Sequence, residues 1–160
     1  MKFSTKELEN IKQGKIFIKK ISKKNYWIKP IEDSTYKQGN ITAHTRYLKL
    51  LKKNIKSNIP KVIITKRKID NKKYLILICE NIIGKVINLN KKILDKNLKE
   101  GMFKLLKKGY VLDFYGNRNF VINKDNKVYY IDSRMPLFSE KSNEGDRFKI
   151  SKKRTIELLK

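Results

Sequence analysis

The stretch Gly109–Arg134 reads GYVLDFYGNRNFVINKDNKVYYIDSR and has the clearest local pattern in the chain. It contains two short β-rich runs, NFVIN and KVYYID, separated by the polar segment KDNK. Two such runs around a polar turn predict a β-hairpin. Asn119 begins the first run and Asp132 ends the second, so the hairpin is expected to place both side chains at its open end.

An Asn and an Asp held at one end of a rigid hairpin are hard oxygen ligands at a fixed separation, which suits Mg²⁺. A loop, Asp113–Arg118, leads into the hairpin, and Gly109 ends the predicted helix before it. By itself the stretch also fits an ordinary surface hairpin with an Asn cap and a terminal Asp, because short motifs are hypotheses until their context supports them.

The segments GYVLDFYGNRNFVI and KVYYIDSR resemble the catalytic loop and the metal-binding strand of the protein-kinase-like superfamily, which includes protein kinases and small-molecule kinases. In that family a helix ends in Gly, a catalytic Asp follows, an Asn ligates Mg²⁺, and a hairpin leads to a second Asp on Mg²⁺. The resemblance implies that Asp113 is the catalytic base, that Asn119 and Asp132 bind the metal, and that ATP and Mg²⁺ are the cofactors.

The N-terminal part begins with a capping box, STKE, which predicts a helix over Ser4–Lys12 that ends at Gly14. Two alternating runs, Lys15–Ile21 and Asn25–Ile31, then predict a strand pair. This pair resembles the strands of a kinase N-terminal lobe, which implies that Lys29 is the phosphate-binding cation. Only Gly14 stands where the family keeps its Gly-rich loop, and the sequence contains no G-x-G-x-x-G.

Helical periodicity over Ile41–Asn54 corresponds to the family's C-helix. The Glu that pairs with the strand Lys in the family is expected near His44, but the sequence has no acidic residue between Asp33 and Asp70. The Lys–Glu ion pair is therefore absent or supplied differently. His44 is the only histidine, and a structural or solvent-facing role is expected for it.

Two further strands are predicted over Lys61–Ile69 and Tyr74–Glu80, and the second is apolar enough to be buried on both faces. The segment YLILICENIIGKVI resembles the kinase hinge, whose backbone binds adenine. A central strand and loop of any mixed sheet explains this segment equally well. The positions to which the resemblance gives the adenine-binding role are Glu80, Asn81 and Ile82.

A long helix is predicted over Lys91–Lys108, with Asn90 as its N-cap. Gly101 lies inside this helix and is expected to weaken it by about 1 kcal/mol relative to Ala. After the hairpin, MPLFSEKSNEGD is typical of a loop, and SKKRTIELL predicts a short final helix.

Length and composition limit the protein class. A chain of 160 residues can bury one core, and its single cysteine, Cys79, allows no internal disulfide. The sequence contains no apolar run long enough to span a bilayer and no signal-peptide pattern, so a cytoplasmic protein without a transmembrane segment is expected.

The formal net charge is +25, with only 15 acidic residues. A bias towards A and T in the genome would favour Asp and Glu as well as Lys, so codon usage does not explain the imbalance. A surface this basic attracts polyanions such as RNA or DNA. The sequence contains no aromatic RNA-recognition signature, so binding is expected to be independent of base sequence.

The succession of elements predicts an α+β chain, a reduced two-lobed kinase-like fold in one domain covering residues 1–160. A small antiparallel β-sheet lobe with a C-helix would cover about 1–80, a hinge about 80–90 and a truncated helical lobe about 90–160. The resemblance implies a nucleotide cleft between the lobes and phosphotransfer from ATP to an acceptor that the sequence does not identify.

The sequence also departs from the family. The family's Asp lies five residues before its Asn, whereas Asp113 lies six before Asn119 and four before Asn117. Either the loop is remodelled by one residue or the catalytic base is missing. Ser133 and Arg134 replace the usual Phe-Gly, and only 28 residues follow Asp132. Two alternatives therefore remain open: a pseudokinase that keeps the fold as a binding module, and a basic nucleic-acid-binding protein unrelated to kinases.

Overall fold

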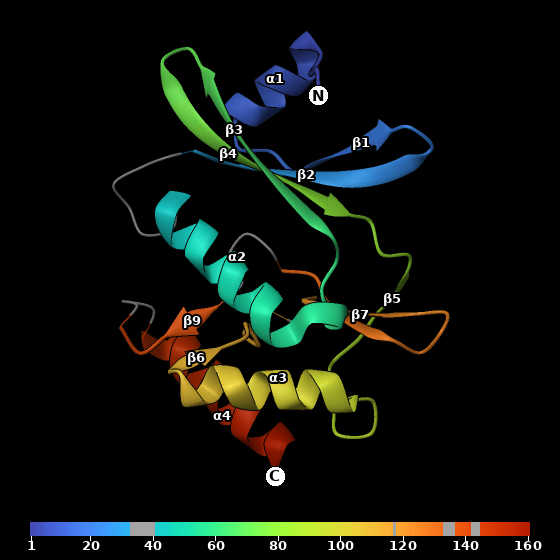
Figure 1. Cartoon of the computed structure of the whole chain (residues 1–160), viewed down its shortest axis with the longest axis vertical. Coiled ribbons are helices and arrows are strands. Elements are labelled where there is room, and N and C mark those ends of the chain that lie inside the picture. The colour runs from blue at the N-terminus through green and yellow to red at the C-terminus, as the bar shows by residue number, and fades with distance from the viewer. Residues whose placement is uncertain (33–40, 117, 133–136, 142–144) are drawn as a thin grey trace. The chain divides into compact units, whose positions relative to one another are not determined.

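The computed structural model describes residues 1–32, 41–116, 118–132, 137–141 and 145–160. Residues 33–40 lie outside the described residues, as do Asn117, Ser133 and Arg134. The described residues form four α-helices and antiparallel sheets, so the predicted α+β class is confirmed (Figure 1). Within these ranges no helix is both long and apolar enough to cross a bilayer.

The chain divides into two units. The first comprises Met1–Thr45 and Lys61–Asn81, and the second comprises Arg46–Pro60 and Ile82–Lys160. Helix α2 (Ile41–Ile55) contributes its first residues to the first unit and the others to the second. The predicted kinase-like division into lobes with a hinge at about 80–90 stays a prediction.

The first unit is built on a four-stranded antiparallel sheet in the order β1-β2-β4-β3. Both predicted strand pairs are present as two-residue hairpins, with Ser22 in one turn and Asp70 and Asn71 in the other, all at positive φ. Asn and Asp tolerate that conformation better than other non-glycine residues, which explains where the second turn forms. The strands are β1 (Phe17–Ile21), β2 (Lys24–Glu32), β3 (Val62–Ile69) and β4 (Lys72–Glu80).

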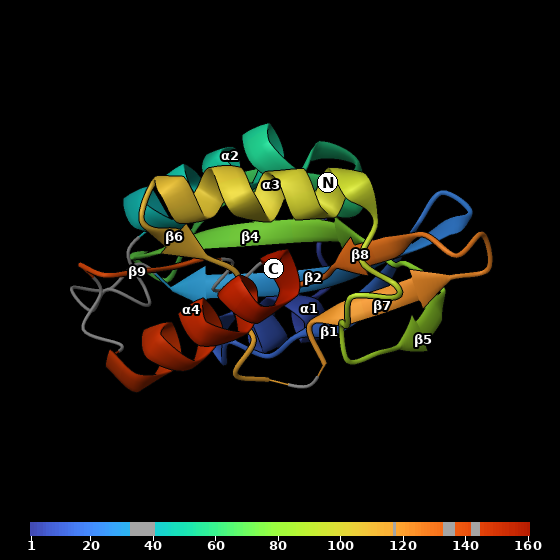
Figure 2. The ribbon, with the colours of Figure 1, turned by 90° about the horizontal axis from the view of Figure 1, so that it is seen from below.

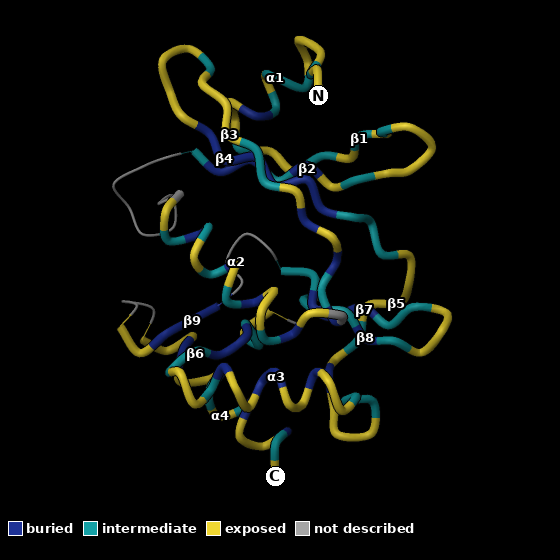
Figure 3. Tube along the Cα trace, in the orientation of Figure 1, coloured by how far each residue is buried: buried dark blue, intermediate teal, exposed yellow. Residues whose placement is uncertain are grey.

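Strand β4 lies at the centre of this sheet and is buried from Tyr74 to Cys79, as its continuous apolar sequence predicts (Figure 3). Helix α1 (Thr5–Lys12) packs its buried Ile11 with Ile28 of β2 and Ile76 of β4. Gly14, at a φ of 65°, ends α1 in the left-handed conformation that glycine adopts without strain.

The capping box at the start of α1 is linked to the sheet by an ion pair. The Ser4 hydroxyl accepts from the Glu7 N–H, and the Glu7 carboxylate accepts from the Ser4 N–H at 2.8 Å. The Lys19 ammonium lies 2.7 Å from both carboxylate oxygens. Partial burial raises the pKa of Glu7, but the hydrogen bonds from Lys19 and Ser4 outweigh burial and hold that pKa below its usual value of 4.5.

Replacing Glu7 with Gln is expected to lower the free energy of unfolding by about 1 kcal/mol at neutral pH, because a charged cap and a half-buried ion pair are lost. A carboxyl whose folded pKa is lowered stabilises the protein above its unfolded pKa, and this contribution disappears as the pH falls through the folded value. Urea unfolding at pH 7 and at about pH 3 measures both effects. If the variant and the parent differ in free energy of unfolding by the same amount at both pH values, the ion-pair explanation is contradicted.

The second unit contains α2 from Arg46 onward, a short η2 turn (Lys56–Asn58), α3 (Lys96–Lys107) and α4 (Gly145–Leu159). Strands β5 (Gly84–Val86), β7 (Phe120–Asn123) and β8 (Val128–Tyr130) lie side by side in one sheet (Figure 2). A separate pair joins β6 (Tyr110–Val111) to β9 (Phe138–Ser139).

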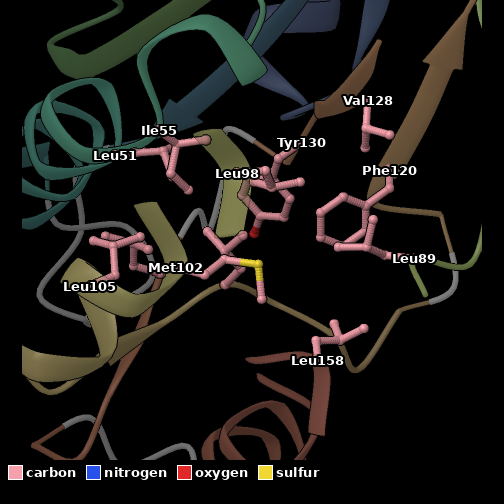
Figure 4. Packing of buried hydrophobic residues seen from close by; sticks show 12 residues of the cluster. Leu51, Ile55, Leu89, Leu98, Met102, Leu105, Phe120, Val128, Tyr130 and Leu158 are labelled. Atoms are coloured by element: carbon pink, nitrogen blue, oxygen red, sulfur yellow. The ribbon is translucent and has the colours of Figure 1, made fainter. Parts of the chain in front are cut away.

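The core of this unit gathers apolar side chains from its helices and from the hairpin. In Figure 4 the ring of Tyr130 lies in this core beside Phe120 and Leu98. The ring centroids of Phe120 and Tyr130 are 5.2 Å apart, and those of Phe114 and Phe120 are 5.1 Å apart. The loop before the hairpin is thus packed through Phe114 onto the same aromatic cluster.

The predicted start of the long helix is wrong. The Asn90 side chain accepts from the N–H groups of Lys92 and Ile93 and caps only a turn, while α3 begins after Asp95, whose carboxylate accepts from the Leu98 N–H at 2.9 Å. The other oxygen of Asp95 accepts from the buried Asn58 amide at 2.6 Å. This tertiary contact holds Asp95 in the capping position, and a sequence pattern alone does not reveal it.

Candidate functional site

The hairpin predicted from NFVIN and KVYYID is confirmed. Phe120 pairs with Tyr130, and the Ile131 N–H donates to the Asn119 carbonyl at 2.8 Å, which extends the pairing by one residue beyond both strands. Asn119 and Asp132 therefore lie at the open end of the hairpin, as expected. The opposite end is a tight turn in which Asn126 has a positive φ of 58°.

The loop that begins at Asp113 is tied to this open end by two hydrogen bonds. The Asp113 N–H donates to the Tyr130 hydroxyl at 3.1 Å, and the Asn119 side-chain amide donates to the Asp113 carbonyl at 3.1 Å. The Asp113 carboxylate accepts from the N–H of Tyr115 at 2.7 Å, which orients it. Asp113 and Asn119 are thus held together by their own local contacts.

The pKa of Tyr130 links Asp132 electrostatically to the hydroxyl that binds the Asp113 N–H. Its side chain is buried, and its pKa is raised well above its usual range by burial, then by the negative charge of Asp132 and by that of Asp113. The hydrogen bond from the Asp113 N–H acts in the opposite direction and is outweighed. Tyr130 therefore stays a neutral phenol at physiological pH, and both carboxylates lie within electrostatic range of its hydroxyl.

Two further contacts support the Asp113 loop. Strand β6, directly before the loop, pairs with β9 through Val111 and Phe138. On the other side, the Phe114 N–H donates to the hydroxyl of the buried Ser151 on α4 at 3.0 Å. The short strand β9 and the role of Ser151 have no signal in the sequence, because a two-residue strand shows no periodicity.

The chain thus gathers three oxygen-bearing side chains, those of Asp113, Asn119 and Asp132, in the second unit. No group of three or more His, Cys, Asp or Glu side chains able to hold a metal occurs among the residues that the structure describes. The carboxylate of Asp132 and the amide oxygen of Asn119 are nevertheless donors of the kind that Mg²⁺ uses with few protein ligands, the other positions being taken by water and phosphate.

The remaining predicted site residues are placed as follows. Lys29 is half-buried on β2, opposite Leu77 and on the same face as Trp27. The carboxylate of Glu80 accepts weakly from the Lys61 N–H at 3.4 Å, and Gly14 ends α1. These three residues belong to the first unit and Ile82 begins the second, so their convergence with Asp113, Asn119 and Asp132 stays a prediction.

His44 is buried on α2, only 3% exposed, where the family resemblance places a Glu. The expectation of a structural or solvent-facing histidine is consistent with this burial. Within α2, which reads ITAHTRYLKLLKKNI, there is no acidic residue.

A cavity of about 310 Å³ adjoins the Asp113 loop within the second unit. Its walls are mostly apolar, and its cation is Arg154, whose guanidinium donates to the Leu89 carbonyl at 3.0 Å and to the Glu157 carboxylate at 3.3 Å. The cavity is lined by Ile87, Asn88, Leu89, Phe114, Gly116, Phe120, Ile150 and Arg154.

The sequence matches no protein-family model and no curated protein. The functional argument therefore rests on the site itself.

Replacing Tyr130 with Phe is expected to lower the free energy of unfolding by about 1–3 kcal/mol, because the half-buried Asp113 N–H would lose its acceptor. Urea unfolding measures the loss. Tyr129→Phe is the matched control on the same strand, since Tyr129 is only half-buried, and its effect should stay within about 0.5 kcal/mol. Equal effects of the two substitutions would show that the Tyr130 hydroxyl does not hold the loop.

Proposed function

We propose that this protein binds Mg²⁺-ATP and transfers the γ-phosphoryl group to a small acceptor, as a minimal, divergent relative of the protein-kinase-like superfamily. The observation that supports the proposal is that Asp113 and Asn119 are joined by a hydrogen bond at the open end of the hairpin, where the second strand leads into Asp132. These are the three side chains to which the resemblance assigns the base and the metal ligands.

Each residue has a proposed role. The carboxylate of Asp132 and the amide oxygen of Asn119 hold Mg²⁺, and the Asn119 amide nitrogen, used as a donor to the Asp113 carbonyl, orients that oxygen. Asp113 accepts the proton of the acceptor hydroxyl. Lys29 is proposed as the cation on the phosphates, Glu80 and Ile82 as backbone contacts to adenine, and Gly14 as the remaining glycine of the phosphate loop.

The spacing of six residues between Asp113 and Asn119 is compatible with these roles. The extra residue lengthens the loop, but the hydrogen bond between the Asn119 side chain and the Asp113 carbonyl closes the loop at its two ends. This geometry supports the proposal of a loop remodelled by one residue, in which Asp113 keeps the role of the base. Phe114, which a five-residue spacing would place in the catalytic position, instead stacks on Phe120.

The cavity next to the loop supports a small acceptor. Phe114 and Gly116 follow Asp113 closely and line this cavity, so the cavity adjoins the loop that carries the proposed base. Apolar walls with one guanidinium fit an amphipathic hydroxyl compound that carries a negative charge.

The test is a thermal-unfolding titration with ATP and Mg²⁺ together, and with each alone. Ligand at 100 times its dissociation constant stabilises the folded state by about 2.7 kcal/mol, which raises Tm by roughly 5–10 °C for a chain of this size. The expected result is a rise that depends on concentration and requires both components. No rise with the mixture would refute the proposal.

A second candidate is binding of Mg²⁺-ATP without turnover. It is favoured by the absence of an acidic residue in α2, since the family uses such a residue to position its phosphate-binding Lys. Transfer of radiolabelled phosphate, or its slow release to water, separates the two candidates. Binding with neither reaction would establish the second.

A further inference from the structure

Helix α2 carries an unusual density of unbalanced positive charge. Its exposed side chains include Arg46, Lys49 and Lys53, spaced three and four residues apart, and the helix contains no acidic residue. Like charges at these spacings face each other on a helix and destabilise it. Neither Lys49 nor Lys53 forms an ion pair with any acidic side chain in the described part of the chain.

Helix α3, which the end of α2 contacts, carries a second group of exposed cations. Gly101 lies directly against the backbone of Asn54 at the end of α2, and the Lys108 ammonium donates to the Asn54 side chain at 3.2 Å. These contacts place the C-terminal end of α2 against α3, and the two helices come together there in Figure 1. Lys104, Lys107 and Lys108 are exposed on α3 and at its end, again at spacings of three and four. The α2–α3 basic face is defined by Arg46, Lys49, Lys53, Lys104, Lys107 and Lys108.

Some lysines elsewhere in the chain are paired with acidic side chains, among them Lys152 in the second unit. Lys12, Lys19 and Lys72 each pair with an acidic side chain at 2.7–3.2 Å. None of the six cations of the α2–α3 basic face forms an ion pair in the described part of the chain, and Glu100, one helical turn before Lys104, is the acidic residue within these two helices. An excess of positive charge of this kind is typical of a surface that binds an anionic partner.

One aromatic side chain lies among these cations. Phe103 on α3 is 48% exposed, and the Lys107 ammonium lies 4.4 Å from its ring centroid. An exposed aromatic ring next to backbone-binding cations is a stacking platform for an unpaired base. A base inside a duplex is already stacked and cannot use it.

We propose that the α2–α3 basic face binds single-stranded nucleic acid, with its cations on the phosphates and Phe103 stacked on a base. Anionic membranes fit less well, because surface-binding helices bury an apolar face, and among the described residues of α2 and α3 only Phe103 is a large exposed apolar side chain. Protein partners fit less well, because the contact regions of protein interfaces are depleted in Lys. The proposal is independent of phosphotransfer.

The experiment is fluorescence anisotropy of the full chain with labelled, mixed-sequence single strands of roughly 20 nucleotides, both RNA and DNA. Six phosphate contacts predict a loss of about 10²–10³-fold in affinity between about 50 and 200 mM salt. A duplex of the same sequence, anionic vesicles and poly-glutamate are the competing ligands.

The decisive variant is Lys53→Glu with Lys104→Glu, and its matched control is Lys124→Glu with Lys149→Glu. Both pairs are exposed, lie in the second unit and change the net charge equally. The first pair is expected to weaken single-strand binding at least 10-fold at low salt, and the control less than 3-fold. Phe103→Ala should weaken single-strand binding about 5-fold or more and leave duplex binding unchanged.

The charge reversals should not unfold the protein, because the carboxylate introduced by Lys53→Glu would lie four residues from Lys49 and replace repulsion with attraction. Circular dichroism and Tm check this, and Lys53→Gln with Lys104→Gln serves as a milder variant with the same expected direction. Equal weakening by the variant and its control would overturn the proposal in favour of diffuse charge. Tighter binding of the duplex, the vesicles or poly-glutamate than of the single strands would also overturn it.

Discussion

Asp132→Ala is expected to weaken Mg²⁺-ATP binding by at least about 100-fold, because a direct carboxylate ligand contributes more than the outer-shell partners whose loss costs 10–100-fold. The substitution removes one of two protein oxygens proposed to hold the cation, and the ion's charge is then balanced less well by the site. Isothermal titration of Mg²⁺-ATP into parent and variant measures the loss. ATP without Mg²⁺ should bind both proteins equally.

Asp125→Ala is the matched control for this prediction. Asp125 is an exposed Asp on the same hairpin, but it lies in the turn at the opposite end from Asp132. Its removal changes the net charge equally and should leave binding within about 2-fold, since exposed charges at this distance are largely screened. Asp132→Asn keeps the size of the side chain and should still weaken binding. If the parent binds Mg²⁺-ATP and Asp132→Ala binds it as tightly, Asp132 is not a metal ligand.

Gly101→Ala is expected to lower the free energy of unfolding by about 1–3 kcal/mol, the usual cost of forcing an extra carbon into a packed interior. Helix propensity alone predicts the opposite, a gain of about 1 kcal/mol. We expect steric contact to outweigh helix propensity and make the change in the free energy of unfolding a loss. A Cβ at position 101 would lie 2.5 Å from the Asn54 carbonyl oxygen and 3.1 Å from a side-chain carbon of Ile55. A backbone oxygen cannot move aside as a flexible side chain can, so α3 must shift away from α2.

Gly145→Ala tests the same substitution without the contact. Gly145 is the first residue of α4, and a Cβ there meets nothing within 4 Å. This variant should be neutral or more stable by up to about 1 kcal/mol. Urea unfolding of the two variants gives the comparison directly. A Gly101→Ala protein as stable as the parent would mean that the two helices are not in close contact.

Local chemistry in the sequence was enough to predict several elements. The Ser4–Glu7 capping box, the two hairpins of the first unit and the hairpin over residues 119–132 all formed where expected. Each depends on a cap, or on a turn between two apolar or alternating runs, within a few residues, so the interactions that specify it are encoded next to one another.

Elements that depend on distant partners were missed or misplaced. Strand β5 has three residues and β9 has two, too few to show a period, and each exists because another segment pairs with it. The start of α3 moved from Asn90 to Asp95 because Asn58, 37 residues earlier, binds the Asp95 carboxylate. Helix α4 begins earlier than SKKRTIELL suggests, because Phe148 is buried in a cluster with Val111 and Phe138.

The candidate site also has one part that the sequence predicted and one part that only the structure revealed. Its three polar side chains were predictable, since Asn119 and Asp132 are placed by one hairpin and Asp113 by the adjacent loop. The role of Tyr130 was not, because an alternating strand identifies it only as a buried aromatic. Its hydroxyl gains a function only when the loop brings the Asp113 N–H to it and when burial makes its ionisation costly. Sequence by itself therefore determined which residues share a turn or a strand end, because those distances follow from covalent connectivity. Tertiary structure decided which backbone groups those residues satisfy and how closely α3 can approach α2, because both depend on atoms contributed by remote segments.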